Sequence, residues 1–252
     1  MTRHTLQGMS DNEVLWTQRR ATLKAAAGWV AMGGLPAAMA QQRSNVVELV
    51  GDVLLNGQRL SPQQVIQSGD EIITGPASRL LFVIGNAAFH VRQNSRLAVE
   101  RGSTLNTVSL LRLLTGAVVS AFGRGSARTI STPTLTAGIR GTGVYTEVMA
   151  DRRSYFCNCY GTVDMAAGGD RALSVSSYHQ SFWGEVEPKE GRFLTPAGAI
   201  NHTDEELEFL ARLIGERTAW QIAGRTGVKD GKGNMDERPG QVHPAATPTP
   251  AR

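Results

Sequence analysis

The sequence lacks a strong net charge, any common catalytic signature and, beyond its first 40 residues, any long apolar run. Its 252 residues carry a formal charge of +4, of which the first 40 residues, with four basic and two acidic side chains, contribute +2. The remaining +2 is too small and too scattered for nucleic-acid binding. No later stretch approaches the roughly 20 apolar residues of a membrane span, so we expect none in the mature form. GxSxG, HExxH and paired-carboxylate signatures are missing, so we predict that the protein is not an enzyme.

Cysteine is also scarce, because Cys157 and Cys159 in "YFCNCYG" are the only two. On a strand both thiols point to one face, with Cα atoms about 6.5 to 7 Å apart, so a mutual disulfide would need a local kink. Three readings stay open: a structural or simply paired couple, a redox-active or intermolecular couple, and soft-metal ligation. Two thiolates cannot fill a tetrahedral zinc site, although His179 or His90 could approach them in space. We therefore predict no cofactor and no metal site, with Cys157 and Cys159 as the candidate ligands if one exists.

The amino-terminal segment carries a targeting pattern. Arg19 and Arg20 precede an apolar run over residues 25–40, which ends in the small-x-small pattern of Ala38 and Ala40. This resembles a bacterial twin-arginine export signal with its cleavage site. The run is shorter than a membrane span and contains glycine and proline, so we predict that residues 1–40 are a cleaved signal peptide. The alternative is a retained membrane anchor; cleavage would leave a soluble periplasmic protein.

Residues 41–200 show the pattern of a β domain. Short runs rich in branched and aromatic residues alternate with turn signals about ten residues apart, as in all-β folds. Asn56-Gly57 lies between two apolar runs and predicts a tight hairpin, because both residues tolerate positive φ. Further turns are expected at glycines such as Gly116 and Gly161. The spacing predicts an all-β domain that is solenoid-like or sandwich-like.

Several of these stretches, in order, resemble the FecR domain family, named for the ferric-citrate regulator. They include "VVELVGDVLLNGQRL", "IQSGDEIITGPASRLLFVIGNAAFHVRQNSRLAVE", "LLRLLTGAVVSAF" and, most specifically, "STPTLTAGIRGTGVY". The resemblance covers roughly residues 46–186. It implies a β-rich, solenoid-like periplasmic domain, which in inner-membrane regulators relays the state of a receptor to a sigma factor. Only 18 residues precede the arginine pair here, so we expect a free-standing exported protein without a folded anti-sigma domain.

The glycine-rich stretch "GIRGTGVY" raises the question of a ligand loop. It lacks the Lys-Ser/Thr of a phosphate-binding loop, and no helix pattern follows it. We predict an architectural motif in which Gly138, Gly141 and Gly143 permit a turn or a close approach of the backbone. In this motif, which also contains Thr142, Arg140 would cap carbonyls or pair with an acid. Ligand binding is the alternative.

The carboxyl-terminal part changes to a helical pattern. Thr203 with Glu206 three residues later forms a predicted capping box, followed by apolar residues at helical spacing. We predict one helix over residues 201–223 that docks on the β domain. Residues 224–252 mix glycine, proline and charge without periodicity and are predicted to be a disordered tail.

The function that we favour is a non-enzymatic periplasmic binding, scaffold or sensory module of the cell envelope. Its expected partner is an envelope protein or an extracellular polymer. One alternative is an inner-membrane-anchored regulator of sigma/anti-sigma signalling. The other is a thiol redox or metal-binding protein that uses Cys157 and Cys159.

Overall fold

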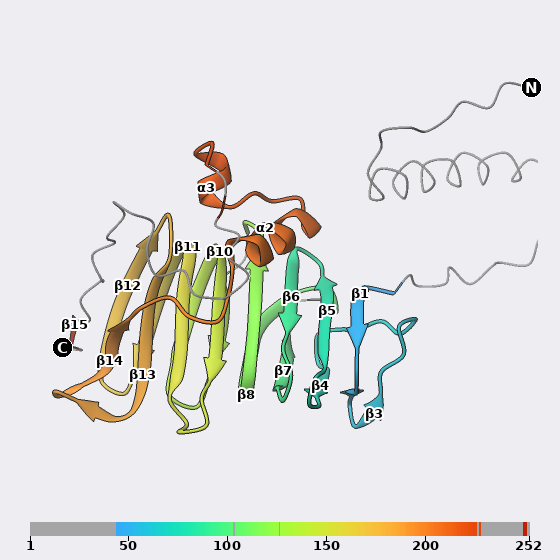
Figure 1. The fold of residues 1–252 in the computed structure, drawn as a ribbon, viewed down its shortest axis with the longest axis horizontal. Helices are drawn as coiled ribbons and strands as arrows, with labels where there is room; N and C mark the ends of the chain where they lie inside the picture. Colours follow the sequence, from blue (N-terminus) through green and yellow to red (C-terminus); the bar gives the residue numbers. More distant parts are fainter. Residues whose placement is uncertain (1–43, 103, 126, 226, 228–248, 251–252) are drawn as a thin grey trace, which may run out of the picture. The chain divides into compact units, whose positions relative to one another are not determined.

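The described part of the chain is mostly β-strand, which confirms the predicted all-β class (Figure 1). The computed structural model describes residues 44–102, 104–125, 127–225, 227 and 249–250. The signal residues Arg19, Arg20, Ala38 and Ala40 and most of the tail lie outside these ranges. Within them, no helix has the length and apolarity needed to cross a membrane.

The strands form two layers that share three long strands. One, the capped layer, contains β1 (Val46–Val50), β5 (Arg79–Ile84), β6 (Ala87–Val91), β13 (Gln180–Lys189) and β14 (Arg192–Ala197). The other, the uncapped layer, contains β2 (Val53–Leu55), β3 (Gln58–Arg59), β4 (Glu71–Thr74), β7 (Arg96–Arg101), β9 (Arg128–Ser131) and β12 (Asp170–Ser176), with β15 (Thr249–Pro250) beside β12. The long strands are β8 (Val108–Phe122), β10 (Thr136–Val148) and β11 (Ser154–Ala167).

Each long strand changes partners near its middle. The first half of β8 pairs with β7 and β9 and its second half with β6. Similarly, β10 changes from β9 to β8, and β11 from β13 to β12. Gly116, Gly141 and Gly161 lie at these points with φ of +74°, +57° and +104°. The turns expected at Gly116 and Gly161 are therefore bends inside continuous strands, which carry the chain from one layer to the other.

The "GIRGTGVY" stretch lies at the bend of β10. Gly141 has the left-handed φ that a side chain would disfavour, and a Cβ on Gly143 would overlap the Tyr160 ring. Gly138, in contrast, is an ordinary strand position where a Cβ would keep normal contact distances. Thr142 is buried and donates to Asn158 Oδ1 at 3.1 Å.

Arg140 does not have the capping or ion-pair role predicted for it. Its side chain is exposed, and it makes no hydrogen bond or ion pair with another described residue. The physical reason is its register on β10: Arg140 pairs with Thr162 on the outward side of the uncapped layer, away from both apolar clusters. The charge therefore faces solvent beside the bend.

The space between the layers holds the main apolar core. Side chains of both layers contribute to it, among them Phe82, Leu97, Phe156 and Val163, all without solvent exposure. Phe82 stacks on Phe89 with ring centroids 5.0 Å apart. We call this cluster the inner core.

A second apolar cluster lies on the other face of the capped layer, beneath the carboxyl-terminal segment. Residues 198–225, here called the cap, include α2 (Asp204–Leu213) and α3 (Ala219–Ile222). Leu207, Leu210 and Trp220 of the cap pack against sheet residues that include Tyr145 and Tyr155. We call this cluster the outer cluster, and Figure 1 shows both helices together on one side of the strands.

The helix region begins where the sequence predicts, but its first helix is shorter than predicted. Thr203 accepts from the Glu206 amide while the Glu206 side chain accepts from the Thr203 amide, which confirms the predicted capping box. One helix over 201–223 was expected, but α2 ends before Gly215, which has φ +75°. Thr218 then opens α3 with a capping box of its own.

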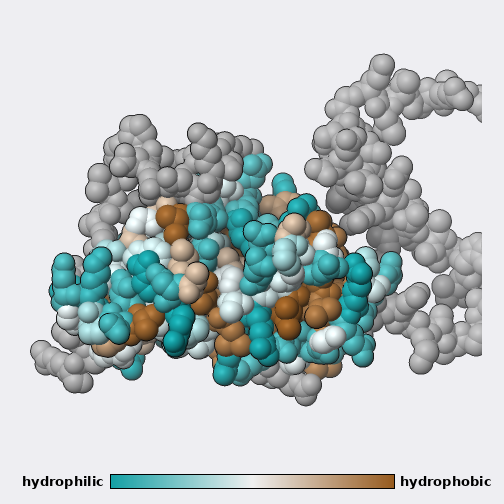
Figure 2. All heavy atoms as spheres, turned by 60° about the horizontal axis from the view of Figure 1, so that its bottom comes forward, coloured by the Kyte–Doolittle hydropathy of each residue, from teal (hydrophilic) through white to brown (hydrophobic). Residues whose placement is uncertain are grey.

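The surface of the described residues is mixed. On the face in Figure 2, apolar side chains are interspersed among polar ones. The exposed large apolar residues are distributed over several elements: Val47, Leu105, Leu114, Leu173, Val175, Val186, Phe209 and Ile222.

Candidate metal centre

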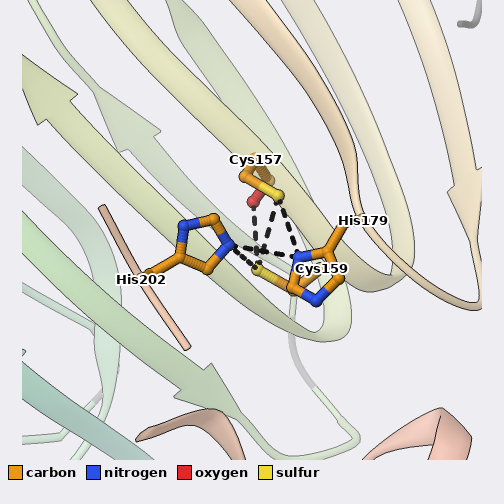
Figure 3. Close-up of side chains that lie close together, drawn as sticks. All are labelled: Cys157, Cys159, His179 and His202. Atoms are coloured by element: carbon orange, nitrogen blue, oxygen red, sulfur yellow. Dashed lines mark hydrogen bonds between the residues drawn. The ribbon is translucent and has the colours of Figure 1, made fainter. Parts of the chain in front are cut away.

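Two thiols and two imidazoles meet beneath the cap (Figure 3). Cys157 and Cys159 lie on β11, just before its bend. His179 lies in the turn between β12 and β13, and His202 lies in the cap, two residues before α2 begins. All four residues are buried, and their four ligand atoms lie within 4.8 Å of one another.

The alternation of β11 places both thiols in the outer cluster. Tyr155, Cys157 and Cys159 face the cap, while Phe156 faces the inner core. This is the period of two that any strand imposes. The prediction that both thiols share one face is therefore confirmed.

Two irregular backbone positions bring the histidines to the thiols. His179 has φ +34°, and its amide donates to the Cys159 carbonyl at 2.9 Å, which fixes the turn against β11. His202 follows Asn201, which has φ +57°. The His202 ring stacks on Tyr145 with centroids 4.8 Å apart. Both imidazoles are thus held in defined orientations before any ion is considered.

The sulfur–sulfur distance and two sulfur–nitrogen distances in the cluster match the edges of a zinc tetrahedron. The two sulfur atoms are 3.6 Å apart, His179 Nδ1 lies 3.4 Å from Cys157 Sγ, and His202 Nε2 lies 3.4 Å from Cys159 Sγ. The two imidazole nitrogens are 3.1 Å apart. Zinc bonds of about 2.3 Å to sulfur and about 2.0 to 2.1 Å to nitrogen give edges of about 3.3 to 3.8 Å. Three of the six edges therefore have the size that a bound zinc ion requires, and the nitrogen–nitrogen edge of 3.1 Å is slightly shorter.

The second nitrogen of each imidazole is already engaged. His202 Nδ1 donates to the Ile200 carbonyl at 2.6 Å, and His179 Nε2 donates to Asp204 Oδ1 at 2.9 Å. A carbonyl can only accept, and a carboxylate ordinarily does, so each neutral imidazole directs a lone pair at the thiols. Two lone pairs 3.1 Å apart require a proton or a cation between them.

The cluster also perturbs its own ionisation. Burial alone would raise the pKa of Cys157, but the hydrogen bond from Cys159 and the charges of His202 and His179 bring that pKa well below its usual value. Burial and the neighbouring Cys157 raise the pKa of Cys159. Burial opposes protonation of His179, yet the Cys157 charge and Asp204 raise its pKa to about 9. These directions favour a Cys157 thiolate beside a protonated His179 when no ion is bound, and a metal would displace the proton of His179.

The sequence predicts no metal site, with Cys157 and Cys159 as the ligands if one exists; the structure adds two histidines to this pair. Cys157 and Cys159 are both free thiols, and His179 approaches them as considered from the sequence. His90 does not; its Nδ1 lies 3.3 Å from Glu206 Oε1 instead. His202 was missed, because it is 43 residues from Cys159 in the chain. The one signal in the sequence is its position directly before the Thr203 capping box, because a helix start holds the neighbouring backbone in a defined conformation.

Comparison with known proteins identifies no family. No family model and no curated protein matches the chain. Two crystal structures of a "putative anti-sigma factor" from Parabacteroides distasonis ATCC 8503 are similar, with 9% and 11% identity and a TM-score of 0.42 each. Both matches cover 54% of this chain and 70% or 69% of the other. Likeness at this level assigns no function, so the site has to be interpreted from its own geometry.

Proposed function

We propose that the protein is a non-enzymatic metal-binding module that holds one zinc ion between Cys157, Cys159, His179 and His202. The observation that carries the proposal is the orientation of the two imidazoles. Each has its outer nitrogen engaged, and the inner nitrogens lie 3.1 Å from each other and 3.4 Å from one thiol each. A zinc-bound histidine usually donates a hydrogen bond from its second ring nitrogen.

The donor set favours zinc. Two thiolates and two imidazoles balance the charge of a divalent ion and suit a metal that prefers sulfur and nitrogen ligands in a tetrahedron. Four protein ligands also leave no position for water or substrate, which is the arrangement of structural sites. The burial of all four side chains supports the same role, and with it the proposal that the protein does not catalyse a reaction.

Metal analysis of the full-length protein tests this function. After expression with added zinc and removal of loosely bound ions, we expect about one zinc per chain. Changing Cys157→Ser together with Cys159→Ser should remove nearly all of it. The matched control is His90→Gln, since His90 is half-buried nearby but faces Glu206, and this variant should keep its zinc.

Cobalt gives a second measurement that does not depend on the stability of a variant. The wild-type protein loaded with Co²⁺ should show the visible and thiolate charge-transfer bands of a tetrahedral site with sulfur ligands. Wild-type protein that stays metal-free after loading, or a His90→Gln variant that loses as much zinc as the cysteine variants, would contradict the proposal.

We further propose that this module is exported and acts in the periplasm on an envelope protein or an extracellular polymer. The support lies in the sequence: the pair Arg19 and Arg20, and Ala38 and Ala40 at the end of the apolar run. Amino-terminal sequencing of protein from the envelope fraction tests it. A chain that begins near residue 41 supports export with cleavage, whereas an intact amino terminus favours the anchored regulator.

A further inference from the structure

We propose that the metal ion holds the cap on the sheet, so that loss of the ion releases residues 198–225 and uncovers the outer cluster. This inference rests on the proposed zinc site and concerns its regulation. The four ligands come from two parts of the molecule. Three of them belong to the sheet and its β12–β13 turn, and His202 is the one that belongs to the cap.

His202 transmits the position of the ion directly to α2. It is followed at once by the N-cap Thr203 and by Asp204, the first residue of the helix. Asp204 accepts from His179 Nε2 at 2.9 Å and lies 3.2 Å from the Tyr178 hydroxyl. The hydrogen bond between His179 and Asp204 therefore joins a ligand on the sheet side to the start of α2. The bond from the ion to His202 would add a second connection.

The second helix packs on the site as well. The Trp220 ring of α3 stacks on the His179 ring at 26° with centroids 5.6 Å apart. It also meets the rings of Tyr160 and Tyr178 edge-on. Any movement of His179 after loss of the ion thus disturbs the surface on which α3 rests.

The cap has little independent stability. Its helices span 10 and 4 residues, and helices shorter than about 12 to 15 residues are marginal in water without tertiary contacts. The fully buried apolar side chains of its two helices are Leu207, Leu210, Ala211 and Trp220. Of its ion pairs, Glu206 with Arg92 is partly exposed and contributes little, and the buried pair of Asp204 runs to His179, itself a ligand of the proposed ion. A four-coordinate ion would be the strongest single attachment.

Release of the cap would change the surface of the protein. The outer cluster on the sheet is rich in tyrosine, with Tyr145, Tyr155 and Tyr160 among its buried members. Such aromatic faces are typical of protein interfaces when they are exposed. Metal occupancy would thus decide whether this face is covered by the cap or open to solvent.

Hydrogen exchange with mass spectrometry on the full-length protein tests the inference. We expect amides of α2 and α3 to exchange about tenfold faster or more after chelation of zinc, with β8 and β10 unchanged. In His202→Ala, the cap should exchange fast even with zinc present, and chelation should add little. Leu207→Ala is the matched control, because it removes an apolar contact of the cap and leaves all four metal ligands in place. In this variant, zinc should still slow the exchange of the cap amides.

The outcomes separate this inference from the proposed function. A wild-type protein without zinc refutes the function and the inference together. A wild-type protein with about one zinc per chain, whose cap exchanges equally with and without the ion, refutes the inference alone. The inference is also overturned if chelation accelerates β8 and β10 as much as the cap, because the ion would then stabilise the whole domain.

Discussion

The inner core and the outer cluster lie on opposite faces of the same capped layer and differ in chemistry. The inner core consists of aliphatic and aromatic side chains, with one methionine, Met165, as its only sulfur. The outer cluster contains both cysteines and four tyrosines and adjoins His179, His202 and Asp204. Burial stabilises the first without further conditions, whereas the second contains ionisable groups that are costly to bury unless they are paired or bind a metal. The comparison indicates that the inner core maintains the fold. The outer cluster, under the proposal above, makes the position of the cap depend on metal binding.

The largest effect is expected from breaking the inner core. Phe82→Ala should lower the free energy of unfolding by about 3 to 5 kcal/mol, because the side chain is fully buried and its removal leaves a cavity. Urea denaturation measures this loss. Zinc content per folded chain should not change, and a loss of zinc in this variant would show that the two clusters are not independent.

A smaller effect is expected where β10 passes between the layers. Gly141→Val should cost about 1 to 3 kcal/mol, because a branched side chain is strained at the positive φ of this residue. The neighbouring Arg140→Ala is the control, since its exposed side chain should change stability by less than about 0.5 kcal/mol. Thermal melting of both variants checks the pair, and equal melting temperatures would argue against a strained bend.

The smallest effect concerns the ion pair at the edge of the outer cluster. Burial would raise the pKa of Glu206, but hydrogen bonding to His90 and the Arg92 charge lower it overall. A carboxylate with a lowered folded pKa stabilises the folded state above its unfolded pKa, near 4.3, and this stabilisation disappears as the pH falls through the folded value.

Glu206→Gln should therefore be less stable than wild type by about 1 kcal/mol near neutral pH, given the partial exposure of the pair. The difference between the two proteins should shrink as the pH falls below about 4.3 and vanish once it has passed through the lowered folded pKa. Measuring that difference at each pH removes contributions that both share, such as loss of metal in acid. A difference that persists unchanged in acid would assign the effect to packing.

Local features of the fold were accessible from the sequence because they depend on neighbouring residues. Asn56 and Gly57 form the predicted hairpin turn, with φ of +52° and +78°, and Thr203 is the predicted N-cap. The same local reasoning misread Gly116, because a glycine with positive φ can end a strand or bend one. Which of these occurs depends on the partners of the strand on each side, and those are distant in the sequence.

The site shows the same limit more sharply. The shared face of Cys157 and Cys159 follows from the strand period alone. His179 and His202 reach them through a turn and a cap whose positions are set by tertiary packing, at separations of 22 residues from Cys157 and 43 residues from Cys159. No fixed ligand spacing exists in such a site, so a search for finger-like patterns could not find it.

The sharing of strands between the two layers has a consequence for how the protein unfolds. Because β8, β10 and β11 belong to both layers, neither layer can separate without breaking the hydrogen-bonded ladders of the other. The β domain should therefore melt as one cooperative unit. The cap has no such shared backbone and is joined to the sheet by side chains, which allows it to open on its own while the strands beneath it remain paired.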